Sequence, residues 1–329
     1  MLSKFIQKIR KIILKPQEHL EIIKNDTNNI NELTIIIFKK CWRNIYDNFQ
    51  RKFARPSIRN ILIKIELLFK KKNQNKLSDL IQSHNEDLRH NGITFFSNLE
   101  KNIDFKKIFV DLSQENDLYS AYENNTFYKK SEKKGSHKMG YIKTEKLIQN
   151  EEILKLVNNE LIVSVVKSKL GSNVIFDNIW SWWSFKHSDS PIGPQNFHRD
   201  YNSINFLKLF VYLTDVTEET GPHMFVQTSH NKDVFNNIGR YQDDDVKKEF
   251  KESDILKITG PRYTTFLANT FCLHKGLPPR NDDRLLLCVL YSVNPSRGSP
   301  KIPTYQVNNF KIKKTLLENK NLNKMYFKF

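Results

Sequence analysis

The spacing of apolar residues separates a helical first part of the chain from a strand-rich second part. Apolar positions recur every three to four residues over 31–48 and 56–72, which predicts two helices, the second with Pro56 in its first turn. An amphipathic pattern also covers residues 2–14, with apolar residues on one face and lysines mostly on the other. Three consecutive lysines at 70–72 precede a polar stretch, so we expect residues 1–75 to form a basic helical extension.

From residue 76 to Gly171 the pattern stays mostly helical. A helix is expected to end near Asn91-Gly92 and to lead into a short strand at 93–96. Residues 129–140 are polar and basic and predict a loop. Residues 144–170 predict a helix, for which Gly171 is a suitable C-terminal cap.

Beyond Gly171 the pattern is typical of a mainly β protein. Short runs rich in β-branched and aromatic residues alternate with Gly- and Pro-containing turns, at 174–185, 205–216, 255–259, 263–268 and 284–293. Such runs predict a sandwich or barrel with flanking helices. A helical pattern returns near 241–252. We expect the main domain to cover residues 76–300 and a basic, weakly patterned tail to cover 301–329.

Composition and charge limit the class of protein. Hydrophobic residues make up 39% of the 329 positions and aromatic residues 12%, which is enough for a core. The formal net charge is +17, and most of the excess lies in the first 74 residues. This distribution favours an anionic contact of the extension, and no nucleic-acid-binding module is recognisable, so we expect no nucleic-acid partner.

Neither a membrane span nor a secretory signal is predicted. No run approaches 18 uncharged apolar residues, and no cleavage site follows the basic N-terminus. The three cysteines have neither disulfide nor metal-site spacing, which favours reduced thiols and a cytoplasmic protein. Two interpretations of residues 2–14 stay open: packing against the protein itself, which we favour, or peripheral association with an anionic membrane surface.

A histidine and an aspartate two residues apart form the candidate metal site. In a strand, His198 and Asp200 would point to the same face, close enough to bind one ion. The spacing alone is weak evidence, because it occurs a second time in His187 and Asp189. That second pair lies in a turn-rich loop, so we prefer the first pair, which runs into a strand-like stretch.

A third ligand from a later strand would complete a facial triad, which leaves open coordination positions on iron(II). His274 is the preferred candidate, with His223 and His230 as alternatives that have simpler structural explanations. Arg284, ten residues beyond His274, opens an apolar strand and could point into a barrel. A buried guanidinium needs an anion, and a dicarboxylate would suit it. Without the other motifs, Arg284 would be interpreted as a surface residue after Asp282.

Three segments resemble the phytanoyl-CoA dioxygenase family: NFHRD, FLKLFVYLTDVTEETGPHMFVQTSHN and TFLANTFCLHKGLPPRNDDRLLLCVLYS. The resemblance covers roughly residues 76–295 and implies a double-stranded β-helix, a squashed barrel of two sheets with helices outside. In that family the H-x-D pair and a distal histidine bind iron(II), and an arginine about ten residues later binds 2-oxoglutarate. These positions match His198, Asp200, His274 and Arg284. This chain departs from the family at 227–228, where it has Gln-Thr and the family more often has Pro-Gly. The departure bears on the geometry of the turn and not on the metal site.

The resemblance implies a dioxygenase that uses iron(II), 2-oxoglutarate and O2 to hydroxylate a small-molecule or lipid- or glycan-linked substrate, releasing succinate and CO2. The presence of Asp200 favours hydroxylation, because related halogenases lack that carboxylate. Lys208, which shares a strand face with Phe210, either contacts 2-oxoglutarate or faces solvent. Asn196 and Asn269 are candidates for orienting the ligands. The alternatives are a non-redox cupin-like metal-binding barrel and a degenerate binding protein of the same fold.

Overall fold

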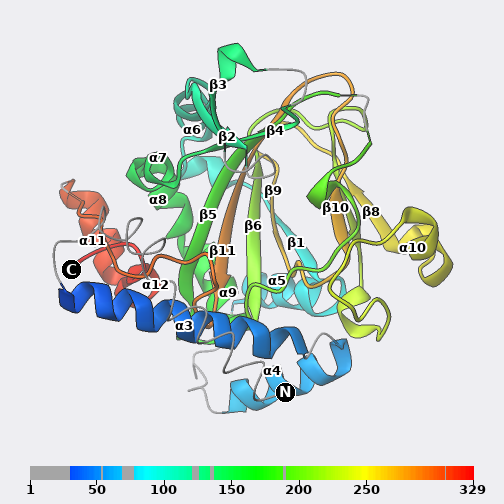
Figure 1. Ribbon diagram of the computed structural model, residues 1–329, viewed down its shortest axis with the longest axis horizontal. Helices are drawn as coiled ribbons and strands as arrows, with labels where there is room; N and C mark the ends of the chain where they lie inside the picture. Colours follow the sequence, from blue (N-terminus) through cyan, green and yellow to red (C-terminus); the bar gives the residue numbers. More distant parts are fainter. Residues whose placement is uncertain are drawn as a thin grey trace.

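The fold consists of two antiparallel β-sheets, with helices on the outer side of the larger one (Figure 1). It was obtained as a computed structural model, which describes residues 30–52, 55–68, 78–120, 126–133, 137–187, 190–307 and 309–329. The amphipathic segment at 2–14 lies outside these residues, so its helix remains a prediction. None of the helices that the structure describes combines the length and hydrophobicity needed to span a bilayer.

The larger sheet has the strand order β1-β9-β6-β11-β5-β4-β2-β3. Its strands are Ile93–Phe96 (β1), Asp117–Ser120 (β2), Thr126–Lys129 (β3), Met139–Ile142 (β4), Ile175–Ser184 (β5), Phe206–Tyr212 (β6), Thr265–Ala268 (β9) and Arg284–Ser292 (β11). The smaller sheet has the order β10-β7-β8, with strands His223–Val226 (β7), Ile255–Ile258 (β8) and His274–Gly276 (β10). The mainly β architecture expected from the sequence is therefore confirmed.

The central strands carry a different core on each face. On one face, residues such as Leu209 and Leu287 are buried against the helices. On the other, residues such as Phe210 and Leu286 are buried toward the smaller sheet. The hydroxyl of Tyr212 on β6 donates a hydrogen bond of 3.0 Å to a main-chain carbonyl of β8, which links the two sheets. Because both of its faces are covered, β11 is buried at every position.

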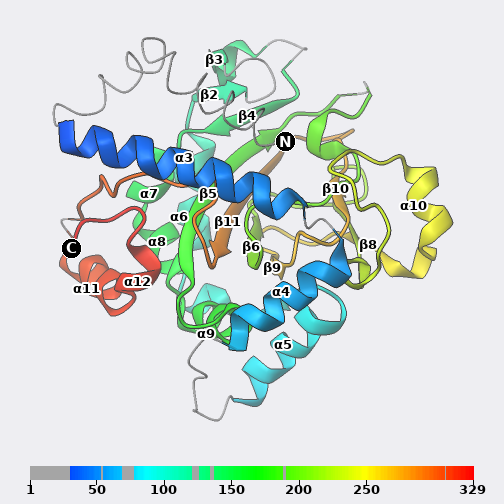
Figure 2. The ribbon, with the colours of Figure 1, turned by 60° about the horizontal axis from the view of Figure 1, so that its bottom comes forward.

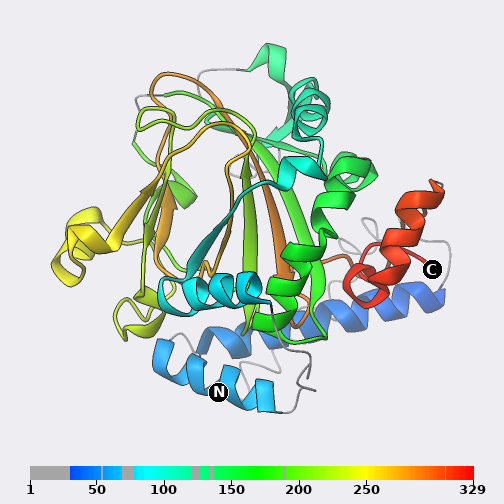
Figure 3. The same ribbon diagram turned by 180° about the vertical axis from the view of Figure 1, so that it is seen from behind.

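The outer face of the larger sheet is covered by helices, as the view from behind shows (Figure 3). These helices are Asp79–His90 (α5), Phe105–Ser113 (α6), Thr144–Gln149 (α7), Glu151–Val157 (α8) and Glu160–Leu170 (α9). The predicted helix end near Asn91 and the strand at 93–96 are confirmed. The single helix expected at 144–170 is three helices, because Asn150 and Asn159 each cap the start of the next one with a side-chain oxygen.

The loop expected at 129–140 is bounded by strands that the sequence pattern did not reveal. β3 ends at Lys129 and β4 begins at Met139, and both belong to the larger sheet. The reason is physical: β3 has no buried position, so it lacks the alternation of apolar and polar residues that identifies a strand.

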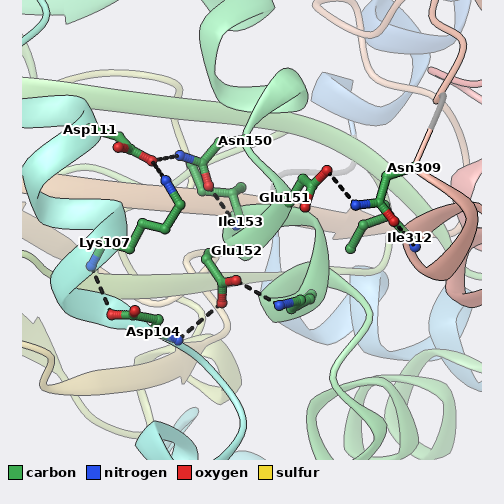
Figure 4. A network of polar contacts seen from close by, with 10 residues as sticks. Asp104, Lys107, Asp111, Asn150, Glu151, Glu152, Ile153, Asn309 and Ile312 are labelled. Carbon is green, nitrogen blue, oxygen red and sulfur yellow. Dashed lines mark hydrogen bonds and ion pairs between the residues drawn. The ribbon is translucent and has the colours of Figure 1, made fainter.

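The residues from 301 on, expected as a basic and weakly patterned tail, pack behind the larger sheet. They form two helices, Phe310–Glu318 (α11) and Lys320–Asn323 (α12), and bury Ile312 and Tyr326 in the core behind the larger sheet. Figure 4 shows how polar contacts join α11 to α8: Asn309 donates to Glu151 at 2.8 Å, while Asn150 at the start of α8 donates to Asp111 of α6 at 2.8 Å.

The described part of the N-terminal extension is bound to the main domain. Its helices Ile30–Lys52 (α3) and Pro56–Leu68 (α4) confirm the two predicted helices, with Pro56 as the first residue of α4. Arg43 of α3 donates to the carbonyls of Ser299 at 2.5 Å and Pro300 at 2.8 Å. Figure 1 shows α3 passing across the lower end of the central strands, and Figure 2, in which this end comes forward, shows α3 in front of them. The guanidinium of Arg43, one of the positive charges of this segment, thus binds carbonyl groups of the protein itself.

Candidate metal centre and its cavity

Two histidines and an aspartate meet at the edge of the smaller sheet. His198 and His274 are antiparallel partners, and each main-chain N–H donates to the carbonyl of the other at 3.0 Å. Asp200 turns back between them: its oxygens lie 3.7 Å from His198 Nε2 and 3.4 Å from His274 Nε2. One ligand atom from each residue lies within 4.8 Å of the others, so the group could bind one metal ion.

The two imidazoles are oriented for metal binding by main-chain carbonyls. His198 Nδ1 lies 2.9 Å from the carbonyl of Asn196, and His274 Nδ1 lies 2.9 Å from that of Cys272. Because a carbonyl can only accept, each Nδ1–H donates and each Nε2 keeps its lone pair for the centre of the site. Burial lowers the pKa of His198 to about 3, so this imidazole is neutral at neutral pH, as a metal ligand must be. Asn196 thus acts through its main chain.

Lys208 faces inward from β6, and its ammonium group donates to Asp200 Oδ2 at 2.7 Å. Burial alone would raise the pKa of Asp200, but Lys208 and His274 hold it well below its ordinary value. The ammonium group also lies 5.4 Å from the ring centroid of Trp180. Lys208 therefore lies at the metal end of the site. Of the two orientations that the strand pattern left open, the structure has the inward one.

Arg284 is the first residue of β11 and is only 3% exposed. Its Nη2 donates to Ser184 Oγ at 3.2 Å, whereas Nε and Nη1 have no hydrogen-bond partner among the described residues. Burial lowers the pKa of Arg284, which expresses the cost of holding this charge away from water. A carboxylate that accepted from the two free N–H groups would offset that cost.

The space beside Arg284 is shaped for a small ligand. A Cβ atom at Gly276 would lie 3.4 Å from Arg284 Nη2, so glycine keeps the approach to the guanidinium open. The indole Nε1 of Trp182 is a second buried donor that lacks a partner in the described residues. Both Arg284 and Trp182 fit a carboxylate, which accepts several hydrogen bonds at once.

A cavity of about 230 Å³ joins the metal end to the arginine end, and we call it the inner cavity. His198, Asp200 and His274 lie at one end and Arg284 at the other. Its other lining side chains include aromatic residues of the central strands: Trp180, Trp182 and Phe210. Sequence reasoning missed Trp182, although its position on the same strand face as Ser184, the Cα partner of Arg284, could have revealed it.

The competing histidines occupy structural positions. His223 lines the inner cavity, but its Nδ1 lies 3.2 Å from the Tyr212 hydroxyl. His230 Nδ1 lies 3.1 Å from the sulfur of Cys272. His187 Nε2 lies 3.3 Å from the side-chain nitrogen of Gln195, while the second half of its pair, at 189, is outside the described residues. His274 is thus the histidine that the fold brings to the first pair.

Asn269, proposed as a ligand-orienting side chain, shapes the turn before His274. Its side-chain oxygen accepts a hydrogen bond of 3.2 Å from the main chain of Phe271. The side chain therefore stabilises the main-chain conformation of this turn and does not orient an imidazole directly.

Two buried arginines hold the chain segments that carry the candidate ligands. Arg199 donates to the carbonyls of Phe271 at 2.7 Å and Ser229 at 2.9 Å. Arg59 of α4, 1% exposed, donates to the carbonyl of Ser203. Both guanidinium groups lie over the ring of Phe271, with centroid distances of 4.3 Å for Arg59 and 5.1 Å for Arg199. The extension thus supports the metal end of the cavity from outside.

Comparison with known proteins connects this chain to a family. The sequence profile of the phytanoyl-CoA dioxygenase (PhyH) family matches residues 67–280, which is more than half of the chain. The comparison with curated proteins gave no match.

Solved structures similar to this one include three proteins. The epimerase SnoN from nogalamycin biosynthesis is 14% identical, with a TM-score of 0.45 over 66% of this chain and 86% of that chain. HygX from Streptomyces hygroscopicus, crystallised with nickel and 2-oxoglutarate, is 11% identical, with a TM-score of 0.47 over 72% and 94%. EctD from S. alaskensis is 14% identical, with a TM-score of 0.47 over 68% and 79%. The family assignment rests on the sequence match alone.

Proposed function

The chain belongs to the phytanoyl-CoA dioxygenase family of iron(II)- and 2-oxoglutarate-dependent oxygenases, and from this premise we propose that it hydroxylates a C–H bond of a small-molecule substrate. The lipid- or glycan-linked substrates and the membrane contact of residues 2–14 remain predictions, because the described residues provide no support for them.

We assign iron(II) to His198, Asp200 and His274. Two imidazoles and one carboxylate would bind one face of the ion and would leave positions for a bidentate co-substrate and for O2. When bound, iron and 2-oxoglutarate supply the oxidising chemistry, in which decarboxylation to succinate and CO2 accompanies oxygen transfer to the substrate.

The protein's own side chains bind and orient the co-substrate. Arg284, whose Nε and Nη1 have no partner among the described residues, would bind its far carboxylate, and the indole N–H of Trp182 in the same cavity would be a further donor. Lys208 contributes positive charge near the iron end, where it also fixes the orientation of Asp200. The aromatic walls of the inner cavity limit the access of water to the reacting groups.

One observation carries this proposal: a buried guanidinium, two of whose donors have no partner in the described part of the chain, faces the same cavity as the candidate iron ligands. A non-redox cupin-like barrel would have no use for Arg284. A degenerate binding protein would not be expected to keep both the complete ligand set and the arginine.

The test is anaerobic addition of iron(II) and 2-oxoglutarate, which should produce the weak visible charge-transfer band of 2-oxoglutarate chelated to iron(II). His198→Ala should abolish the band. His187→Ala, which removes the histidine of the other H-x-D pair, is the matched control and should retain it. Admission of air should then release succinate. A wild-type protein that gives neither band nor succinate contradicts the proposal.

A further inference from the structure

A second cavity, of about 380 Å³, adjoins the candidate metal centre, and we call it the outer cavity. Its lining shares His198, Asp200, Asn202 and Arg240 with the inner cavity but includes neither Lys208 nor Arg284. The outer cavity therefore reaches the same metal ligands without overlapping the arginine end, where the co-substrate carboxylate is proposed to bind.

Three chain segments that are distant in sequence form the wall of the outer cavity: α3 through Asp47, the loop at 238–240, and the segment at 296–298 that follows β11. Tyr46, the neighbour of Asp47, accepts a hydrogen bond of 3.1 Å from Asn294 Nδ2, which holds α3 against the segment after β11. The N-terminal helix thus contributes directly to a cavity beside the metal centre.

Positive charge is available on this wall. Arg240 and Arg297 are exposed, and the side chain of neither makes a hydrogen bond or ion pair with another described residue. Arg199 also lines the cavity, but its guanidinium donates to main-chain carbonyls. Two carboxylates also line the cavity: Asp200, which is paired with Lys208, and Asp47 of α3.

Apolar surface lies beside these arginines. Ile238, two residues before Arg240, lines the outer cavity and is 47% exposed. The wall therefore combines two guanidinium groups that can bind an anionic group with an aliphatic side chain that can contact a carbon skeleton.

We propose that the outer cavity binds the primary substrate, and that this substrate carries an anionic group, a carboxylate or a phosphate, held by Arg240 and Arg297. This inference rests on the proposed function, because it supplies the substrate class for the same iron site. Guanidinium groups pair bidentately with both kinds of anion. An anion held by these arginines would place the attached carbon skeleton beside His198 and Asp200, where a C–H bond can meet the oxidant.

The experiment is calorimetric titration of the protein loaded with nickel(II), which replaces iron without redox chemistry, and with 2-oxoglutarate. The probes are phenyl phosphate, benzoate and the uncharged benzyl alcohol. We expect at least one anion to bind about tenfold more tightly than benzyl alcohol, as one or two charge-assisted hydrogen bonds would produce. The stronger of the two anions identifies whether a phosphate or a carboxylate is preferred.

The variants locate the binding. Arg240→Gln and Arg297→Gln should each weaken binding of the preferred anion about fivefold, and the double variant should remove its advantage over benzyl alcohol. Arg262→Gln, which removes an exposed arginine that is paired with Asp215 and lines neither cavity, is the matched control and should bind as the wild type does. Anion binding that survives in the double variant is binding to the metal alone and overturns the inference, as does equal binding of benzyl alcohol.

The iron charge-transfer band of the wild type separates the two proposals. If the band forms but anion binding is independent of the arginines, the substrate inference fails and the proposed function stands. If the wild type gives no band and no succinate, the proposed function fails, and the substrate inference fails with it.

Discussion

The two ends of the inner cavity are both charged and both buried, but they differ in how the charges are balanced. At the metal end, Lys208 is paired with Asp200, and both histidines donate from Nδ1 to main-chain carbonyls. At the other end, Arg284 has one partner, Ser184, and two donor nitrogens without one in the described structure. The chain itself organises the metal end, whereas the arginine end is completed by a ligand.

This difference has an energetic consequence. A buried charge without a partner costs free energy, and a protein retains one where a ligand offsets the cost. Mutations at the metal end should therefore weaken the folded protein even without ligands. Mutations at the arginine end should weaken ligand binding and spare, or raise, the stability of the ligand-free protein.

The largest effect is expected for Asp200→Ala. Loss of a residue that only orients a metal ligand weakens metal binding by up to about 100-fold. Loss of Asp200, a direct ligand, should therefore weaken iron binding by more than about 100-fold. It also leaves the ammonium of Lys208 buried without its partner, which should lower the free energy of unfolding by about 3 kcal/mol. Iron titration and urea unfolding of the metal-free protein measure the two effects. Asp215→Ala, which removes an exposed ion pair with Arg262, should change neither by a comparable amount.

For Arg284→Met we expect the KM for 2-oxoglutarate to rise about 100-fold, because two charge-assisted hydrogen bonds are lost. The ligand-free variant should unfold at the same temperature as the wild type or a higher one, since an uncompensated buried charge has been removed. Thermal unfolding with and without 2-oxoglutarate checks both parts. A clear fall in the unfolding temperature of the ligand-free variant would contradict the comparison and make Arg284 a structural residue.

Lys208→Met tests whether the two ends act on the same co-substrate. Because the ammonium is shared with Asp200, we expect the KM for 2-oxoglutarate to rise only about fivefold, corresponding to one modest interaction. Steady-state succinate release measures it. An unchanged KM would restrict Lys208 to orienting Asp200.

The smallest functional effect is expected for Arg59→Met, which loosens the support of the metal end from α4. The carbonyl of Ser203 loses its donor, so the free energy of unfolding should fall by about 1–3 kcal/mol. Iron affinity should fall a few-fold through the displaced ligand segments, while the KM for 2-oxoglutarate should not change. Arg55→Met, at an exposed arginine just before α4, is the control. Equal effects of the two substitutions on stability and iron affinity would contradict a specific role of Arg59.

The local sequence was sufficient to predict the elements and side chains that depend on neighbours in the chain. Runs of β-branched and aromatic residues between turns identified β5, β6 and β11. The two-residue spacing singled out His198 and Asp200, although Asp200 lies in an irregular segment and not in the expected strand. The inward orientation of Lys208 was considered from the same rule and is observed. The apolar strand after Arg284 indicated a buried arginine only together with the other motifs, and the structure contains it.

Tertiary structure alone decided which distant residues meet. A basic residue in an amphipathic helix has the same local pattern whether it meets solvent or a buried carbonyl, so nothing near Arg59 in the sequence indicated its contact with Ser203. Periodicity also gave no sign of β3, which has no buried face, or of the place of Asp47 beside the metal centre. The physical reason is that periodicity reports how one element is buried, whereas the partner of a polar group is set by packing between segments far apart in the chain.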